Sequence, residues 1–174
     1  MPFEPPEEFN IADWFLDARV REGRGDRVAL RTDERSWTYA EVATLAARYG
    51  SVLADCGVEP EQRVILALDD GPAFVGALFG VLKIGAVVVM VNPRLPDDSI
   101  AYFVGYTRAK APIVEPDAAH AFRQAGEDTP CFRTVLVEGP ELDAALAAAP
   151  DGRRTRADTL FTATSFLAFT GTRA

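Results

Sequence analysis

The chain has 174 residues and a formal net charge of −8, because 26 acidic side chains outnumber 18 basic ones. Its 48% of hydrophobic and 25% of charged residues indicate a folded globular protein with a sizeable core, and the acidic balance argues against nucleic acid as a partner. The longest apolar stretch, residues 79–91, contains Lys83 and two glycines. It falls short of the roughly 20 apolar residues of a membrane span, so we expect no membrane partner.

Few residues in the chain favour disulfide or metal chemistry. Residues 1–9 are acidic and rich in proline, which predicts a disordered or extended lead rather than a secretory signal. Two cysteines, Cys56 and Cys131, cannot form a disulfide framework, and a single histidine, His120, argues against a histidine-based metal site or catalytic triad. We expect a cytoplasmic protein with no metal ligands and an exposed, non-catalytic His120.

The first predicted elements are a helix and a short hairpin. Asn10 is expected to cap a helix that ends at Gly23. Residues 28–30 are predicted as a strand, residues 33–36 as a turn, and Trp37 as part of the returning strand.

A longer helix is predicted to follow this hairpin. Thr38 and Glu41 have the spacing of a capping box, in which each side chain serves a free backbone N–H. Apolar residues recur behind them at helical spacing as far as Cys56, just before Gly57. We interpret Cys56 as a small buried hydrophobic side chain on this apolar stripe.

Strands and helices alternate along the rest of the chain. Continuous apolar runs predict strands at residues 64–68, 87–91, 112–115, 134–137 and 165–169. The helical segments between them are predicted at residues 72–83, 97–108, 116–124 and 141–149. This alternation predicts an α/β fold with an open, doubly wound, mainly parallel sheet flanked by helices. Such sheets bind ligands at the carboxyl ends of their strands, where the loops gather.

Two of the loops expected at those strand ends carry charged or polar residues. Asp69 and Asp70 are adjacent on a turn and point in different directions, so we interpret them as caps of the following helix rather than as an acid–base pair. Asn92, Pro93 and Arg94 end the most apolar strand. A turn role is favoured for these three residues, and lining of an active site is the alternative.

The third loop follows the last predicted strand. Thr170, Gly171 and Thr172 have the hydroxyl and backbone N–H groups that phosphate-binding loops present, although no lysine follows them. The basic residues at 153, 154 and 156 are interpreted as solvated surface.

Three motifs in the first half of the chain resemble those of a known superfamily. Residues 37–42 read W-T-Y-A-E-V, residues 57–64 read G-V-E-P-E-Q-R-V, and residues 82–93 read L-K-I-G-A-V-V-V-M-V-N-P. In this order they resemble the N-terminal part of the acyl-adenylate-forming ligases, which include acyl- and aryl-CoA ligases, luciferases and peptide-synthetase adenylation domains. Glu61 and Gln62 stand where that family usually has Gly-Asp. Residues 10–17 and 22–30 look most like the benzoate-CoA ligase branch.

The resemblance implies an activity, its cofactors and a set of site residues. An aromatic carboxylate such as benzoate would attack the α-phosphate of ATP, with Mg²⁺ present, and coenzyme A would then take the acyl group from the adenylate. Family members surround the departing phosphates with a Ser/Thr/Gly-rich loop that ends in Pro-Lys-Gly. Thr170, Gly171 and Thr172 are the candidate remnant of this loop, and residues 92–94 are the candidate rim of the active site.

The sequence departs from the family pattern at its end. Residues 170–174 read T-G-T-R-A, and the family's aromatic box, ribose-binding aspartate and C-terminal lid with its lysine are absent. We therefore interpret residues 10–174 as a partial N-terminal domain that is inactive alone, and we assign no catalytic residue. The alternative is a non-catalytic binding module that keeps the fold and forms a homodimer, or captures a partner, through exposed surface.

Overall fold

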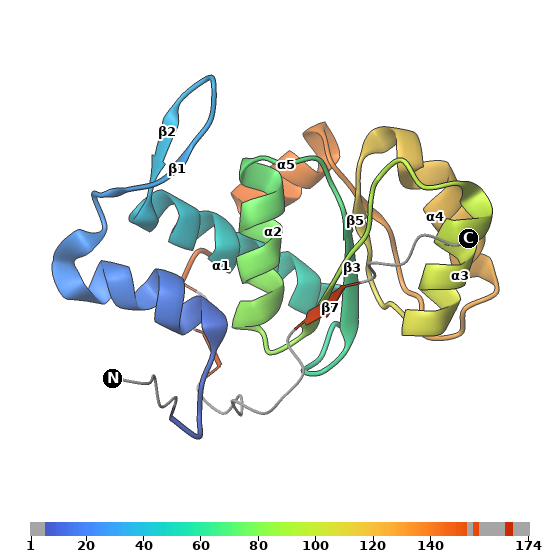
Figure 1. Cartoon of the computed structure of the whole chain (residues 1–174), viewed down its shortest axis with the longest axis horizontal. Helices are drawn as coiled ribbons and strands as arrows, with labels where there is room; N and C mark the ends of the chain where they lie inside the picture. The colour runs from blue at the N-terminus through green and yellow to red at the C-terminus, as the bar shows by residue number, and fades with distance from the viewer. Residues whose placement is uncertain (1–5, 153–154, 157–165, 169–174) are drawn as a thin grey trace.

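The main sheet has five strands, and each neighbouring pair is parallel (Figure 1). The computed structural model describes residues 6–152, 155–156 and 166–168. The order across the sheet is β6-β5-β3-β4-β7. In chain order these strands are β3 (Arg63–Ala67), β4 (Val87–Met90), β5 (Ile113–Val114), β6 (Leu136–Val137) and β7 (Phe166–Ala168).

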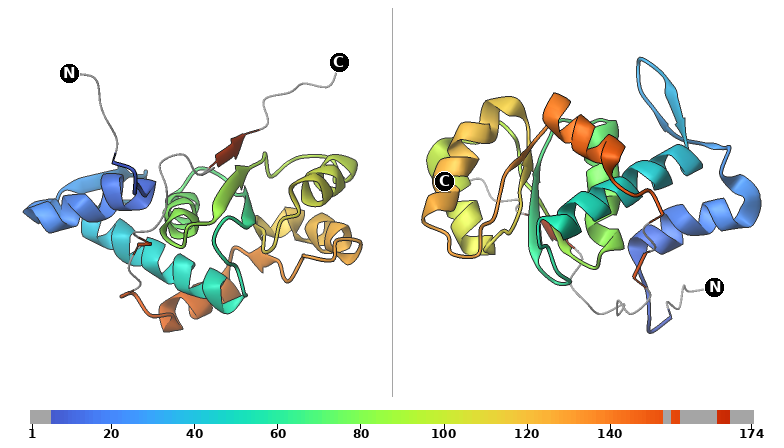
Figure 2. Two further views of the ribbon diagram at one scale, coloured as in Figure 1. Left: turned by 90° about the horizontal axis from the view of Figure 1, so that it is seen from below. Right: turned by 180° about the vertical axis from the view of Figure 1, so that it is seen from behind.

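Helices cover both faces of this sheet. They are α1 (Tyr39–Asp55), α2 (Pro72–Lys83), α3 (Asp97–Thr107), α4 (Ala119–Glu127) and α5 (Pro140–Ala148), with a 3-10 turn η3 (Pro116–Ala118) before α4. The helices α1, α2 and α5 lie on one side of the sheet, and α3 and α4 lie on the other (Figures 1 and 2). The predicted doubly wound α/β fold is therefore confirmed.

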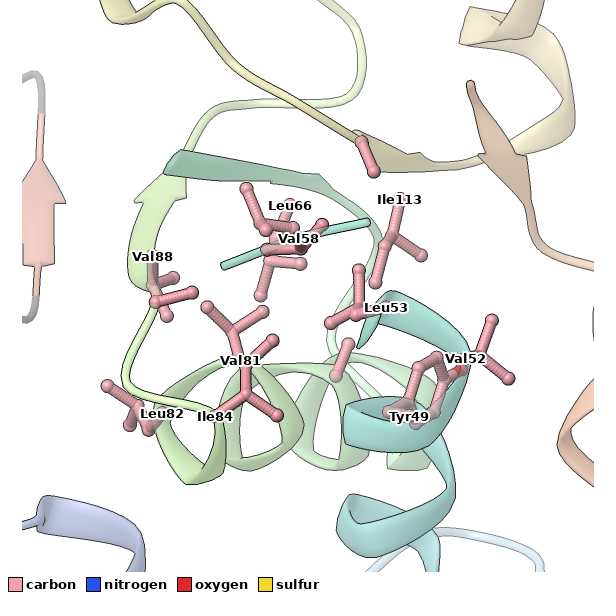
Figure 3. Close-up of a cluster of buried hydrophobic side chains, with 14 of the residues drawn as sticks. Tyr49, Val52, Leu53, Val58, Leu66, Val81, Leu82, Ile84, Val88 and Ile113 are labelled. Carbon is pink, nitrogen blue, oxygen red and sulfur yellow. The ribbon is translucent and has the colours of Figure 1, made fainter. Parts of the chain in front are cut away.

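Consecutive residues of β3 belong to two different cores. Leu66 packs with Leu53 of α1 and Val81 of α2 on one face (Figure 3). The core on the other face is built from strands β3 to β5 and helices α3 and α4: Ile65, Ala67, Val89, Val114, Ile100, Val104 and Phe122. Because both faces of the strand are covered, β3 is apolar at almost every position.

Asn10 caps the N-terminal helical segment, as predicted. Its side-chain Oδ1 accepts a hydrogen bond from the N–H of Ala12 at 2.9 Å, and its carbonyl accepts one from the N–H of Trp14 at 3.0 Å. The segment continues through two π-helical turns, η1 (Asp13–Asp17) and η2 (Val20–Arg24). The two hydrogen bonds that the Asn10 side chain and backbone carbonyl accept thus fix where this helix begins.

A small antiparallel hairpin projects from the body of the molecule (Figure 1). It consists of β1 (Val28–Arg31) and β2 (Ser36–Thr38), which confirms the predicted strand, turn and returning strand. The guanidinium of Arg35 lies over the Trp37 ring, 3.5 Å from its centroid, and this cation–π contact covers the aromatic surface of the hairpin.

The capping box predicted for α1 is present. Thr38 Oγ1 accepts a hydrogen bond from the N–H of Glu41 at 3.2 Å, and Glu41 Oε2 accepts one from the N–H of Thr38 at 2.7 Å. The Thr38 N–H and the Arg35 guanidinium, which donates at 2.7 Å, lower the pKa of Glu41 to about 2. At the other end, Gly57 has a φ of 77°, so the helix stops at a left-handed residue that glycine adopts readily.

The interpretation of Cys56 needs correction. It is the C-cap of α1 and is half-buried rather than buried, since the helix ends at this residue and leaves one side of the thiol uncovered. The thiol still packs against the α1–α2 core. Burial, followed by the nearby Asp55 carboxylate, raises the pKa of Cys56, which disfavours the reactive thiolate.

The helices α1 and α2 cross with close backbone approach at two glycines. A Cβ built on Gly80 would lie 2.6 Å from the Cβ of Tyr49 and 2.9 Å from the carbonyl oxygen of Ala46. A Cβ on Gly76 would lie 2.6 Å from Leu45 Cγ. The absence of side chains at these positions lets the two helices pack at this distance.

Several boundaries differ from those predicted. The strand expected at 134–137 is confined to Leu136–Val137, and the helix expected at 116–124 begins as the 3-10 turn η3 and runs on to Glu127. Pro116 stands at the start of η3, where its missing N–H costs no hydrogen bond. Within the described residues, no helix is long and apolar enough to cross a membrane.

Candidate functional site

The carboxyl ends of the parallel strands form one edge of the main sheet, and this edge is the candidate site. All five strands run in the same direction, so their carboxyl ends lie along this one edge. β7 pairs with β4 in the register Met90↔Ala168, so the carboxyl ends of these two strands are neighbours. This edge is where open α/β sheets bind ligands.

An exposed ion pair joins the first two loops of this edge. The guanidinium of Arg94, after β4, donates to both carboxylate oxygens of Asp69, after β3, at 2.8 and 2.7 Å. The interpretation of Asp69 and Asp70 as helix caps is wrong, because the N-cap of α2 is Gly71 and no side chain caps the helix. The Asp69 carboxylate accepts two hydrogen bonds from the Arg94 guanidinium instead, and this charged bidentate donor is a stronger partner than a backbone N–H.

Asn92, Pro93 and Arg94 form a turn, as favoured from the sequence. Asn92 Oδ1 accepts a hydrogen bond from the N–H of Arg94 at 2.8 Å, and its carbonyl accepts one from the N–H of Leu95 at 3.3 Å. This side-chain-to-backbone bond is the Asx arrangement that asparagine favours in turns. It sets the direction in which Arg94 leaves β4, and lining of an active site by these residues stays a prediction.

Two carboxylates at this edge escaped the sequence analysis. Glu115, after β5, accepts a hydrogen bond from the backbone N–H of Asp69 at 2.8 Å. Glu138 follows β6, and burial, followed by the charge of Glu115, raises its pKa. Each glutamate directly follows a short apolar run, which is the signal that would have placed it at the sheet edge. Within the part of the chain that the structure describes, the edge therefore carries several carboxylates and the guanidinium of Arg94.

The candidate phosphate-loop residues Thr170, Gly171 and Thr172 lie outside the described residues. The structure does place the strand before them, since β7 ends at Ala168 beside β4. The strand predicted at residues 165–169 is thus present as Phe166–Ala168, parallel to its neighbour.

The structure also shows where the other residues considered from the sequence lie. His120 is exposed on α4, as expected. Cys131 is half-buried, and its Sγ lies 3.3 Å from the carbonyl oxygen of Arg108. In the basic group, Arg156 is exposed, whereas residues 153–154 lie outside the described residues.

The described part of the chain offers no ready site for a magnesium ion. It contains no group of three or more His, Cys, Asp or Glu side chains that could hold a metal. At the candidate edge, the Asp69 carboxylate is engaged by Arg94, and one Glu115 oxygen by a backbone N–H. We therefore assign no metal ligand to these residues.

Two surface hollows flank α1 rather than the sheet edge. One, of about 340 Å³, is lined by residues of η1, α1 and the end of α2, including Asp17 and Lys83. The other, of about 400 Å³, lies between the hairpin and α1 and is lined by Trp37 and Arg48 among others. Neither hollow includes a residue of the candidate site.

Comparison with known proteins decides the family. Residues 16–167 match the family described as AMP-binding enzyme. The chain belongs to this family. The resemblance to the N-terminal portion of the adenylate-forming ligases is therefore confirmed.

Relatives within the AMP-binding enzyme family include aryl-acid ligases. The chain is 33% identical over 135 residues to the 4-hydroxybenzoate–CoA/benzoate–CoA ligase of Rhodopseudomonas palustris, covering 78% of this chain and 25% of that protein. It is 30% identical over 141 residues to the 3-hydroxybenzoate–CoA/4-hydroxybenzoate–CoA ligase of Thauera aromatica, covering 81% and 27%. The chain thus spans about a quarter of the length of these curated relatives.

Solved structures show the same fold. The anthranilate CoA ligase AuaEII, determined in complex with anthranoyl-AMP, matches with a TM-score of 0.80 at 24% identity, over 89% of this chain and 30% of that chain. A benzoate CoA ligase from Burkholderia xenovorans LB400 matches with a TM-score of 0.72 at 27% identity, over 91% and 32%.

Proposed function

We propose that this chain is the N-terminal portion of an ATP-dependent aryl-carboxylate–CoA ligase, which forms an acyl-adenylate and then the acyl-CoA thioester. The observation that carries this proposal is the identity of 30–33% with two hydroxybenzoate–CoA ligases over about four-fifths of the chain. The substrates are an aromatic carboxylic acid, ATP with Mg²⁺, and coenzyme A.

The nucleotide phosphates are proposed to bind beyond the carboxyl end of β7. Thr170, Gly171 and Thr172 follow this strand in the sequence, and their backbone N–H and hydroxyl groups are suited to phosphate oxygens. The turn at residues 92–94 leaves the neighbouring strand β4 at the same edge, which supports its assignment as the rim of the site.

We further propose that the 174-residue chain does not form an adenylate by itself. Adenylation needs cations to neutralise the departing phosphates, and the chain has two lysines. The ammonium of Lys83 binds the Asp17 carboxylate, and the backbone N–H of Lys110 bonds to the carbonyl of Arg63, at the amino end of β3. At the carboxyl edge, Arg94 is already paired with Asp69.

The first test is pyrophosphate release by the chain with ATP, Mg²⁺ and a panel of benzoate, hydroxybenzoates and aminobenzoates. We expect no release above the rate without acid. Turnover comparable to that of the Rhodopseudomonas ligase would contradict the proposal that the chain is inactive alone.

The second test asks whether this chain works as part of a ligase. Residues 10–168 replace the matching quarter of the Rhodopseudomonas ligase, and the fusion keeps that enzyme's own phosphate loop and remaining domains. We expect acyl-CoA formation from benzoate or 4-hydroxybenzoate, with the parent ligase as the positive control. A fusion that melts cooperatively but forms no acyl-adenylate would contradict the ligase assignment and favour a non-catalytic module.

A further inference from the structure

A buried ammonium group lies at the end of α2, far from the candidate site. Lys83 is the last residue of this otherwise apolar helix, and its side chain is only 4% exposed. An ammonium group carries three N–H donors, and burial without acceptors would be costly. Its Nζ lies 2.7 and 2.6 Å from the two carboxylate oxygens of Asp17, and 2.9 Å from Thr155 Oγ1. The three acceptors come from two segments distant in the sequence.

Residues 155 and 156 are bound to this position by both side chain and backbone. The Thr155 hydroxyl also donates to Asp17 Oδ2, so lysine, aspartate and threonine each contact the other two. The N–H of Arg156 donates to the carbonyl of Lys83 at 2.9 Å. The Asn10 side chain donates to the carbonyl of Leu82 at 2.8 Å, so the end of α2 also holds the start of the N-terminal helical segment.

Residues 155 and 156 lie between α5 and β7 in the sequence, so fixing them shortens the free chain before β7. After α5, the Pro150 carbonyl lies 2.9 Å from the Ser51 hydroxyl on α1. Asp151 and Gly152 follow, the next described residues after them are Thr155 and Arg156, and β7 begins ten residues after Arg156, at Phe166. If residues 155–156 were released, the fixed point before β7 would move back from Arg156 to Pro150, and the chain between that point and Phe166 would lengthen from ten residues to sixteen. Closing the longer loop is less favourable by a factor of roughly two.

We propose that Lys83, Asp17 and Thr155 form an anchor that fixes the segment leading into β7, with Lys83 and Thr155 as positioning residues for that strand. An apolar residue at position 83 would fill the same space, but it would pack equally well against any apolar segment and would not select residues 155–156. The ammonium instead selects a segment that brings a hydroxyl oxygen beside the Asp17 carboxylate. The anchor is independent of nucleotide binding, and so its test does not depend on the proposed ligase activity.

The test compares Thr155→Val with Thr155→Ser in the full chain. Valine keeps the shape of threonine without its hydroxyl, and serine keeps the hydroxyl. Trypsin cleavage after Arg156 measures local release, and cleavage after the exposed Arg133 is the internal control. Losing a hydrogen bond to a charged group corresponds to local opening that is more frequent by a factor on the order of ten. We expect Thr155→Val to speed cleavage after Arg156 by about this factor, and Thr155→Ser to match the parent chain.

Amine labelling gives a second readout on the same variants, because the chain has only two lysines. We expect Lys83 to react more slowly than Lys110 in the parent chain and in Thr155→Ser, and several-fold faster in Thr155→Val. Hydrogen exchange of the β7 amides should rise by roughly twofold in the valine variant, as the loop argument requires. Unchanged cleavage, labelling and exchange in Thr155→Val would overturn the anchor. Equal changes in Thr155→Ser would overturn it too, because its hydroxyl is retained.

Discussion

Glu61 has a backbone conformation that non-glycine residues rarely adopt. Its φ is 62°, and its backbone is held there by a hydrogen bond from its N–H to the carbonyl of Gly85 at 2.8 Å. In the family motif that residues 57–64 resemble, glycine usually stands at the position of Glu61. Glycine adopts a left-handed conformation without strain, which explains that preference. The tight turn before β3 is therefore kept in this chain at some cost in stability.

Replacing Glu61 with glycine should stabilise the fold. A left-handed conformation costs a residue with a Cβ about 1–2 kcal/mol, and the extra freedom of glycine in the unfolded chain offsets part of that gain. We expect Glu61→Gly to raise the free energy of unfolding by about 0.5–1 kcal/mol in urea denaturation. Glu61→Ala is the matched control, since it removes the carboxylate but keeps the Cβ. An equal gain in the alanine variant would show that the side-chain charge, not the backbone angle, is responsible.

Single residues also show what sequence patterns miss. The capping roles of Asn10, Thr38 and Glu41 were predictable, because each acts on backbone within a few residues of itself. Asp69 looked like a cap by the same rule, yet its partner is Arg94, 25 residues away. The spacing of nearby residues shows that Asp69 could cap α2. It does not show that the neighbouring strand β4 brings Arg94 close enough to bind the same carboxylate.

At the scale of elements, the crossing of α1 and α2 depends on Gly80. Its missing side chain lets the α2 backbone approach Tyr49 and Ala46 of α1. The atoms that a Cβ would meet are the Tyr49 Cβ and the Ala46 carbonyl oxygen, and neither can move without a shift of the α1 backbone. Gly105 in α3 differs, because a Cβ there would meet nothing within 4 Å. The two helical glycines thus provide a matched pair.

The same substitution should have opposite effects at these glycines. Gly80→Ala should lower the free energy of unfolding by about 1–2 kcal/mol, because overpacking outweighs the better helix propensity of alanine. Gly105→Ala should raise it by about 0.5 kcal/mol through helix propensity alone. Thermal and urea unfolding measure both. A stabilised Gly80→Ala variant would mean that the helices can separate without loss of packing.

The existence and order of the elements were predictable, but some of their ends were not. The apolar runs of β3 and β4 identify buried parallel strands because both faces are covered. The residues around 134–138 have the same composition, yet only Leu136 and Val137 pair with β5. The strand β6 lies at the edge of the sheet, and its length is limited by its neighbour β5, which has two residues. The amino-acid composition of residues 134–138 does not show this limit.

At the scale of the whole molecule, one ion pair joins the N-terminal helical segment to α2. Lys83 is 4% exposed and Asp17 is 18% exposed, so removal of either partner leaves the other charge largely buried. The sequence shows Lys83 only as a lysine in an apolar helix. Its partners at 17 and 155 are too distant for any spacing rule, and for this reason the cluster was not predicted.

The pair should behave as one unit in a double-mutant cycle. Lys83→Met should lower the free energy of unfolding by about 3 kcal/mol, because it leaves a carboxylate buried without its counter-charge. Asp17→Asn should also destabilise the fold, and the double variant should lose clearly less than the sum of the two single losses. Urea unfolding of the four proteins measures the coupling. Additive losses would show that the two side chains act independently.

A strand that is apolar on both faces has no solvent-exposed face whose polar residues would fix its register against the neighbouring strands. In β3, a shift by one residue would exchange one aliphatic side chain for another in each core. The polar groups at its two ends resist such a shift. Arg63 Nε donates to the carbonyl of Thr107 at 2.6 Å at one end, and the Asp69 N–H donates to Glu115 at 2.8 Å at the other. The alignment of the sheet is thus set at its margins.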